Sequence, residues 1–157
     1  MIASSLPLTA HRWQQVSFAS TLYLRPILDC LLANVPPEDE AQLRLGLQEA
    51  LVNAAKHGNK LDPYKTIFVH FSMSPTQCWW VITDQGAGFS PPDQCRLPPP
   101  PQPIPDVGCE CGRGLYILYQ IFDQVYWNGD GTELRLCKSF QQSTQRHLCM
   151  GGVGLRD

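Results

Sequence analysis

The sequence predicts an α+β fold, in which β-hairpins are combined with a few helices. Residues 65–74 and 78–84 are strand-like segments separated by a short turn, and residues 124–140 contain a second pair of this kind. Three other segments repeat apolar residues at the three- and four-residue spacing of one helix face. Because short turns connect the strands within each pair, we expect each pair to form a β-hairpin.

The N-terminal part predicts a strand followed by a helix. Residues 12–20, RWQQVSFAS, alternate sufficiently for a strand. Ser20 or Thr21 is expected to cap the following helix. Pro26 lies inside the helical pattern, so the helix begins late or kinks there. The side chains expected to face inward are those of Leu22, Leu24, Ile27, Leu28, Leu31 and Leu32.

A second helix is predicted over residues 39–57. Glu38 and Asp39 favour a helix N-terminus because that end carries a partial positive charge. Gly58 fits the position just past the last turn. The apolar residues expected on the inner face are Leu43, Leu47, Ala50, Leu51 and Ala54.

The rest of the chain contains two hairpins and a third helix, with a long loop between the hairpins. Ile67, Val69, Phe71 and Met73 would share one face of the first strand, and Pro75-Thr76-Gln77 would form the turn. Residues 84–114 are rich in Pro and Gly, which excludes a regular element and favours a lid, a binding loop or disorder. Helical spacing resumes at 114–122, and residues 128–131 would form the turn of the last hairpin.

Length and composition predict one domain over residues 1–140 and a flexible tail over 141–157. The net charge of -2 and the lack of basic runs argue against direct binding to nucleic acid or an anionic membrane. Neither a membrane span nor a secretory signal is recognisable, so we expect a cytoplasmic protein. The seven cysteines are irregularly spaced, and Cys109 and Cys111 are too close together for the usual zinc knuckle.

The first candidate motif is the row Glu49, Asn53 and His57, which places an acid, an amide and an imidazole on one helix face. An Asn oxygen can bind Mg²⁺, which takes few protein ligands when phosphate and water supply the rest. A carboxylate one turn earlier can take a proton from a hydroxyl group. The alternative is a solvated polar face.

The second motif is Asp84-x-Gly86-x-Gly88 at the end of an apolar strand. A carboxylate there can accept a hydrogen bond from an exocyclic amine such as that of adenine, and the glycines let the backbone approach a ligand. The alternative is a simple strand-ending turn.

Two further glycine motifs follow. Gly112-Arg113-Gly114-Leu115 would open a helix whose N–H groups attract phosphate, and Arg113 would add a cation. The alternative is a hinge before a capped helix. Thr132, after Gly131, can bond a purine nitrogen, but this pair also fits a hairpin turn.

In this order, the motifs resemble the N, G1 and G2 boxes of the GHKL ATPase superfamily, from about residue 20 to 140. Within it, EALVNAAKHGN and GRGLYILYQIFDQV are most similar to the anti-sigma-factor serine/threonine kinases. The resemblance implies the Bergerat ATP-binding fold, a two-layer α/β sandwich with a mostly antiparallel mixed sheet and helices on one face. It also implies ATP and Mg²⁺ as cofactors, with a lid at about 90–112.

The resemblance assigns roles to individual residues. Glu49 would be the general base that takes a proton from a Ser or Thr hydroxyl, and Asn53 would bind Mg²⁺. Asp84 would bond the adenine amine, and Thr132 would support the adenine. The pocket and the phosphate cradle would be formed by the remaining motif residues, Gly86, Gly88, Gly112, Arg113, Gly114 and Leu115. His57 matches the motif without a clear role.

The implied partners are a STAS-domain anti-anti-sigma protein, which would be phosphorylated, and a sigma factor or another regulator, which would be sequestered. A homodimer is also implied.

One departure from the family pattern is that some relatives carry an Arg just before the G2 glycines, where this chain has Cys109-Glu110-Cys111. Two alternatives remain: a non-catalytic module whose lid responds to nucleotide, and the ATPase module of a split histidine kinase.

Overall fold

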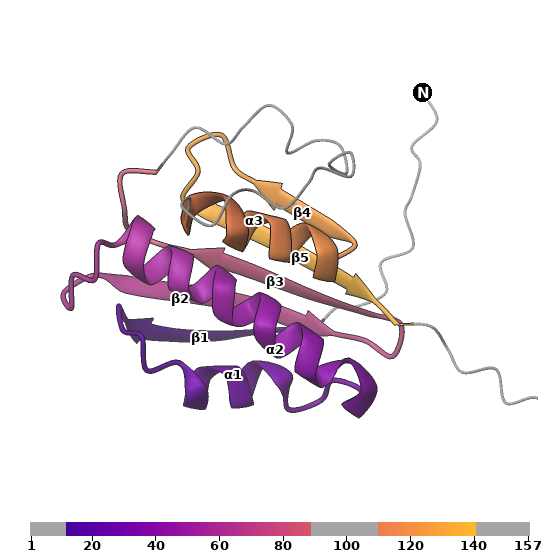
Figure 1. The fold of residues 1–157 in the computed structure, drawn as a ribbon. Coiled ribbons are helices and arrows are strands. Elements are labelled where there is room, and N and C mark those ends of the chain that lie inside the picture. The colour runs from indigo at the N-terminus through magenta and orange to yellow at the C-terminus, as the bar shows by residue number, and fades with distance from the viewer. Residues whose placement is uncertain (1–11, 89–109, 141–157) are drawn as a thin grey trace, which may run out of the picture.

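The computed structural model describes residues 12–88 and 110–140, and the following elements belong to these ranges (Figure 1). Five strands form one sheet in the order β1-β2-β3-β5-β4. The elements in chain order are β1 (Trp13–Ala19), α1 (Arg25–Leu32), α2 (Pro37–Val52), the π-helix η1 (Asn53–Gly58), β2 (Thr66–Met73), β3 (Gln77–Thr83), α3 (Glu110–Ile121), β4 (Gln124–Trp127) and β5 (Glu133–Ser139).

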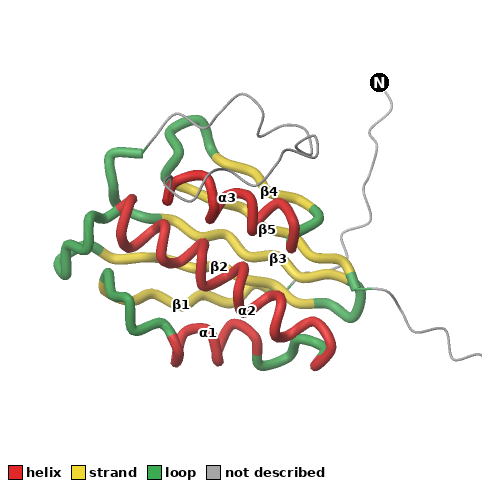
Figure 2. Tube along the Cα trace, viewed as in Figure 1, coloured by secondary structure: helices red, strands yellow, loops and turns green. Residues whose placement is uncertain are grey.

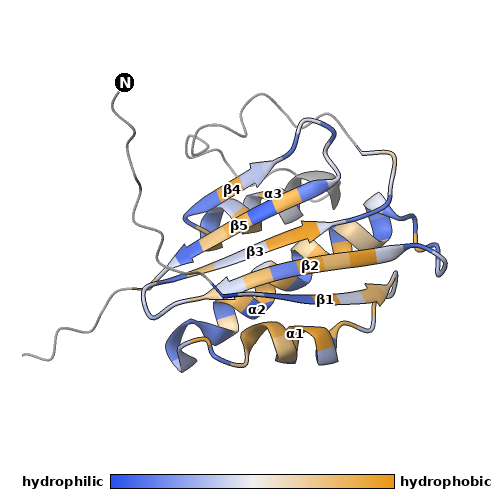
Figure 3. Cartoon of the chain, turned by 180° about the vertical axis from the view of Figure 1, so that it is seen from behind, coloured by the Kyte–Doolittle hydropathy of each residue, from blue (hydrophilic) through white to orange (hydrophobic). Residues whose placement is uncertain are grey.

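The helices cover one face of the sheet, which confirms the predicted two-layer α+β class (Figure 2). Each of the four strand pairings in the described sheet is antiparallel, so the mixed component of the expected sheet has no counterpart there. The predicted hairpins are β2–β3 and β4–β5. Figure 3 shows the sheet from behind, with hydrophilic and hydrophobic residues alternating along its strands.

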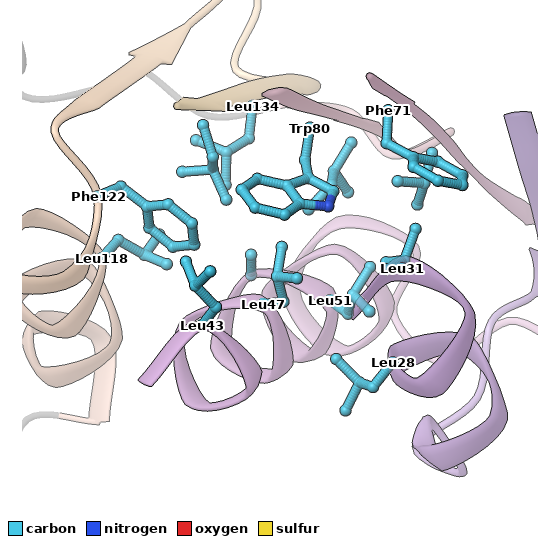
Figure 4. Close-up of a cluster of buried hydrophobic side chains, with 14 of the residues drawn as sticks. Leu28, Leu31, Leu43, Leu47, Leu51, Phe71, Trp80, Leu118, Phe122 and Leu134 are labelled. Atoms are coloured by element: carbon cyan, nitrogen blue, oxygen red, sulfur yellow. The ribbon is translucent and has the colours of Figure 1, made fainter. Parts of the chain in front are cut away.

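The core lies between the sheet and the three helices. Trp80 in β3 is completely buried, and its ring meets that of Phe122 edge-to-face, with centroids 5.9 Å apart. Leu43, Leu47 and Leu51 of α2 pack beneath this pair, as the helical spacing predicts (Figure 4). Burial of each such side chain contributes roughly 1.5–3 kcal/mol, so this cluster fixes α2 and α3 on the sheet.

Helix α1 begins later than its apolar pattern, at Arg25, with Pro26 in the first turn where proline is tolerated. The expected Ser20 or Thr21 cap is wrong, because neither hydroxyl reaches the helix end. The Ser20 hydroxyl donates to the Lys65 carbonyl oxygen at 3.2 Å, and the Thr21 hydroxyl accepts the Tyr23 N–H. Leu22 was expected to face inward but is 55% exposed, because it precedes the helix.

Helix α2 begins close to the predicted residue, with Glu38 and Asp39 in its first turn. It does not continue to residue 57 as an α-helix. From Asn53 the turns widen into η1, whose wide spacing is visible in the bond from the Asn59 N–H to the Ala54 carbonyl, 2.8 Å. Gly58 is therefore the last residue of η1 and not the residue past the helix end, as the sequence predicted.

Helix α3 begins at Glu110, so Gly112 and Gly114 lie within its first turns and not at its start as expected. The turn of the last hairpin is as predicted, with the Gly131 N–H bonded to the Asn128 carbonyl at 3.1 Å. The tail 141–157 and the expected lid, apart from residues 110–112, lie outside the described residues. Among the helices that the structure describes, none has the length and apolar character needed to cross a bilayer.

Candidate functional site

A cavity of about 410 Å³ opens where the end of α2 and η1 meet α3 and the ends of β3, β4 and β5. Its walls are mainly apolar, with polar groups at a few places. The lining residues are Ala50, Asn53, Ala54, His57, Gly58, Lys60, Ile82, Asp84, Gly88, Leu115, Trp127, Gly131 and Leu134. An apolar cleft of this size with few polar groups is typical of a small-molecule site.

Asp84 supplies a carboxylate to one wall. Its Oδ1 accepts the Gly86 N–H at 2.8 Å. The carboxylate also lies directly against Gly58, since its two oxygens are 2.5 and 2.7 Å from where a Cβ on that glycine would stand. Burial raises the pKa of Asp84, while the Gly86 N–H and Lys65 act in the opposite direction. The acid is therefore fixed in position, although its ionised form is only partly compensated.

Gly88 itself lies against the β4–β5 turn. Its φ is +75°, and a Cβ on it would collide with the Asp130 carbonyl oxygen. A side chain would therefore be strained here both by conformation and by contact. A Cβ on Gly86 would similarly collide with the Gly58 carbonyl oxygen. Two of the glycines predicted to shape a pocket thus allow close backbone contacts around Asp84.

Thr132 lies beside this wall but outside the cavity lining. Its hydroxyl accepts a hydrogen bond from Asn128 Nδ2 at 3.1 Å, and its carbonyl accepts the Asp84 N–H at 3.0 Å. The structure therefore links Thr132 to Asp84 through the backbone. Its neighbour Gly131 contributes to the lining.

The other end of the site contains Glu49 and Asn53, one turn apart on α2. Both side chains face Gly114 of α3. A Cβ on Gly114 would stand 3.3 Å from Glu49 Oε2 and 3.4 Å from Asn53 Nδ2. Asn53 lines the cavity, whereas Glu49 lies just beyond it. The absence of a side chain at Gly114 lets the two polar groups approach the α3 backbone.

The remaining motif residues divide into two groups. Leu115 lines the cavity and packs against the core, and His57 lines the cavity although it is largely exposed. Arg113 is exposed. Gly112 belongs to α3, where the helix begins earlier than expected.

Sequence reasoning missed Lys60 and Trp127 as lining residues and gave Gly58 only a helix-ending role. Lys60 brings a cation to the cavity, and Trp127 brings a half-buried indole from β4. Gly58 and Lys60 directly follow the Glu49–His57 row in the sequence, and this position could have identified them as lining residues. Trp127 carries no such signal, because its strand pattern is that of any half-buried strand.

The Glu49–Asn53 end of the site suits a divalent cation that takes few protein ligands, and not one held by a complete cage of side chains. Among the residues described, no three His, Cys, Asp or Glu side chains converge. Mg²⁺ needs only one or two protein oxygens when phosphates and waters complete its shell. Asn53 Oδ1, with Glu49 close by, provides such a donor set.

Comparison with known proteins agrees with this geometry. Residues 20–138 match the histidine kinase-like ATPase domain family, a range that contains every described element from α1 to β4 and most of β5. The chain belongs to this family. The match confirms the resemblance to GHKL ATPases, and a domain of this histidine kinase-like ATPase family implies the use of ATP.

Two curated relatives from Bacillus licheniformis, both named serine-protein kinase RsbW, are similar to this histidine kinase-like ATPase domain. One is 29% identical over 90 residues, which is 56% of each chain, and the other, from a named strain of the species, is 29% identical over 92 residues, 57% of each. The chain thus spans a little over half the length of these relatives. Their names agree with the serine/threonine-kinase branch of the superfamily.

Proposed function

We propose that this domain binds ATP with Mg²⁺ in the cavity and transfers the terminal phosphate to a Ser or Thr hydroxyl of a partner protein. The partner would be a STAS-domain anti-anti-sigma protein, and the domain would in turn sequester a sigma factor or a similar regulator. The similarity to the two serine-protein kinases supports a hydroxyl acceptor.

The proposal rests chiefly on the arrangement of polar groups at the two ends of an apolar cavity. Asp84, a fixed hydrogen-bond acceptor, lies in one wall, and Glu49 and Asn53 meet the α3 backbone at the other end. Ile82, Leu134 and Trp127 supply apolar surface that suits a purine ring. An acceptor beside apolar walls suits a neutral base, and the Glu49–Asn53 pair suits a metal ion with charged phosphates.

Each residue would have a distinct task. Asp84 would accept a hydrogen bond from the adenine amine, and Asn53 would hold Mg²⁺, which neutralises phosphate charge when bound. Glu49 would take the proton of the attacking hydroxyl while the hydroxyl oxygen bonds to the terminal phosphorus. The bond from that phosphorus to the bridging oxygen would break, and ADP would leave with its electrons. Lys60 is a further cation that could attract the nucleotide.

Phosphoryl transfer to a purified STAS-domain protein from the same organism tests the proposal. Labelled phosphate should appear on a Ser or Thr of the partner. Glu49→Gln should slow transfer by about 10²–10⁴-fold, and Asn53→Ala by about 10²-fold or more, because positioning and charge neutralisation dominate this chemistry. Glu38→Gln, the same change at an exposed site on α2, is the control and should transfer normally.

The two alternatives predict other outcomes of the same assay. Nucleotide binding without transfer to any STAS protein would indicate a non-catalytic module whose lid responds to nucleotide. An acid-labile phosphoryl group on the partner would indicate the ATPase module of a split histidine kinase. Transfer that survives both Glu49→Gln and Asn53→Ala would exclude the proposed site.

A further inference from the structure

We propose that Asn59 is a positioning residue for Asp84 and, through it, for recognition of the nucleotide base; this role rests on the proposed nucleotide binding. Asn59 directly follows η1 and is completely buried. A fully buried amide must have its hydrogen-bonding groups satisfied, or it costs free energy. Its hydrogen-bond partners therefore show which segments of the chain it holds in place.

The Asn59 side chain joins three segments that are distant in sequence. Its Oδ1 accepts the Gln85 N–H at 2.7 Å. Its Nδ2 donates to the Ser20 hydroxyl at 2.7 Å and to the Thr66 carbonyl oxygen at 3.3 Å. One amide therefore connects the end of β1, the start of β2 and the residue that follows Asp84.

The bond to Gln85 acts on Asp84 through the backbone. The Asp84 N–H is held by the Thr132 carbonyl on one side, and the next N–H along the chain is held by Asn59 on the other. The residue before Asn59 is Gly58, against which the Asp84 carboxylate lies. Asn59 thus fixes both the peptide after Asp84 and the surface beneath its carboxylate.

A fixed acceptor recognises an amine better than a mobile one, because less conformational freedom is lost on binding. Loss of the Gln85 bond should therefore weaken the contact between Asp84 and the base more than contacts to the phosphates. A residue that only stabilises the fold would weaken all nucleotides alike. Base discrimination separates these two roles.

The experiment is titration calorimetry with ADP and IDP, whose base has a carbonyl oxygen where adenine has the amine. The wild type should prefer ADP, and Asn59→Ala should reduce this preference on the order of tenfold, the value of one hydrogen bond to a charged group. Ser20→Ala is the matched control. It removes one partner of Asn59 but leaves the Gln85 bond, so it should lower the melting temperature and keep the preference.

Two outcomes separate this role from the proposed function. A wild type that does not bind ADP overturns both. ADP binding with an unchanged ADP-to-IDP preference in Asn59→Ala overturns the positioning role alone.

Hydrogen exchange at the Gln85 amide tests the same contact without any variant, in case Asn59→Ala does not fold. The Gln85 N–H should be protected in the wild type and more so with ADP. Exchange at the rate of an open loop would overturn the role.

Discussion

Asp84 places a carboxylate where burial raises its pKa, so the residue that would recognise the base also destabilises the empty fold at neutral pH. We therefore expect Asp84→Asn to have opposite effects on stability and binding. The amide keeps an oxygen for the Gly86 N–H but carries no buried charge. At pH 7 the variant should unfold at a higher temperature than the wild type, while its affinity for ADP should fall about tenfold or more.

The pH dependence of stability tests whether the buried charge of Asp84 causes this difference. A raised pKa means that the folded chain holds this proton more tightly than the unfolded chain, whose Asp titrates near pH 4. Asp84 therefore favours folding below about pH 4, and this contribution is lost as the pH rises through its raised pKa. The advantage of Asp84→Asn should disappear on acidification. Asp130→Asn, at an exposed site in the neighbouring turn, should change neither stability nor affinity.

The residues with recognisable chemistry could be found from sequence, but their contacts could not. Glu49 and Asn53 are one helical turn apart, and this spacing alone put them on one face. That Gly114 would face both of them required the packing of α3 on α2. Asn59 was passed over because its three partners are 7 to 39 residues away in the chain.

One contact between α2 and the end of α3 is made at Gly46, and its effect on the position of α3 can be tested. A Cβ on Gly46 would stand 2.6 Å from Cε2 of Phe122 and 3.2 Å from Cδ1 of Ile121. Ala favours a helix over Gly by about 1 kcal/mol, but overpacking a core costs about 1–3 kcal/mol. Gly46→Ala should therefore destabilise the domain by about 1 kcal/mol and weaken ADP binding, because α3 is pushed from Glu49 and Asn53.

Urea unfolding and ADP titration measure these two effects. Gly129→Ala is the control, since a Cβ there meets no atom within 4 Å and its φ is not positive. It should leave both quantities nearly unchanged. A Gly46→Ala variant that is more stable than the wild type would mean that Phe122 moves freely and that this packing does not set the position of α3.

At the level of elements, the hydrophobic spacing predicted type and order well and boundaries less well. The strands and α2 were predicted with the correct type and order because their apolar residues face one core. The change to η1 at Asn53 was not predicted, because the apolar spacing continues through it; the segment ends with a local bond from the Leu61 N–H to the Ala55 carbonyl, 2.8 Å. The start of α1 was displaced because Leu22 continues an apolar spacing outside the helix.

At the scale of the whole molecule, chemical labelling of two buried thiols measures how often the sheet opens. Cys78 and Cys137 lie in β3 and β5, and burial raises their pKa values to about 12 and about 11. Because the thiolate is the reactive form, both should resist iodoacetamide at pH 8 unless the sheet opens. Cys30 is exposed on α1 and should react at once. Peptide mass spectrometry distinguishes the three sites.

Nucleotide binding should slow the labelling of the two buried thiols without affecting Cys30. A ligand that binds only the folded state stabilises it by RT ln(1 + [L]/Kd), about 2.7 kcal/mol at a hundredfold excess over Kd. If β3 and β5 separate only when the cavity is lost, ADP at that excess should slow labelling at Cys78 and Cys137 by about a hundredfold, and equally. Slowing at Cys137 alone would show that the β4–β5 hairpin opens independently. The cavity would then be built on two separable units, contrary to the single core centred on Trp80.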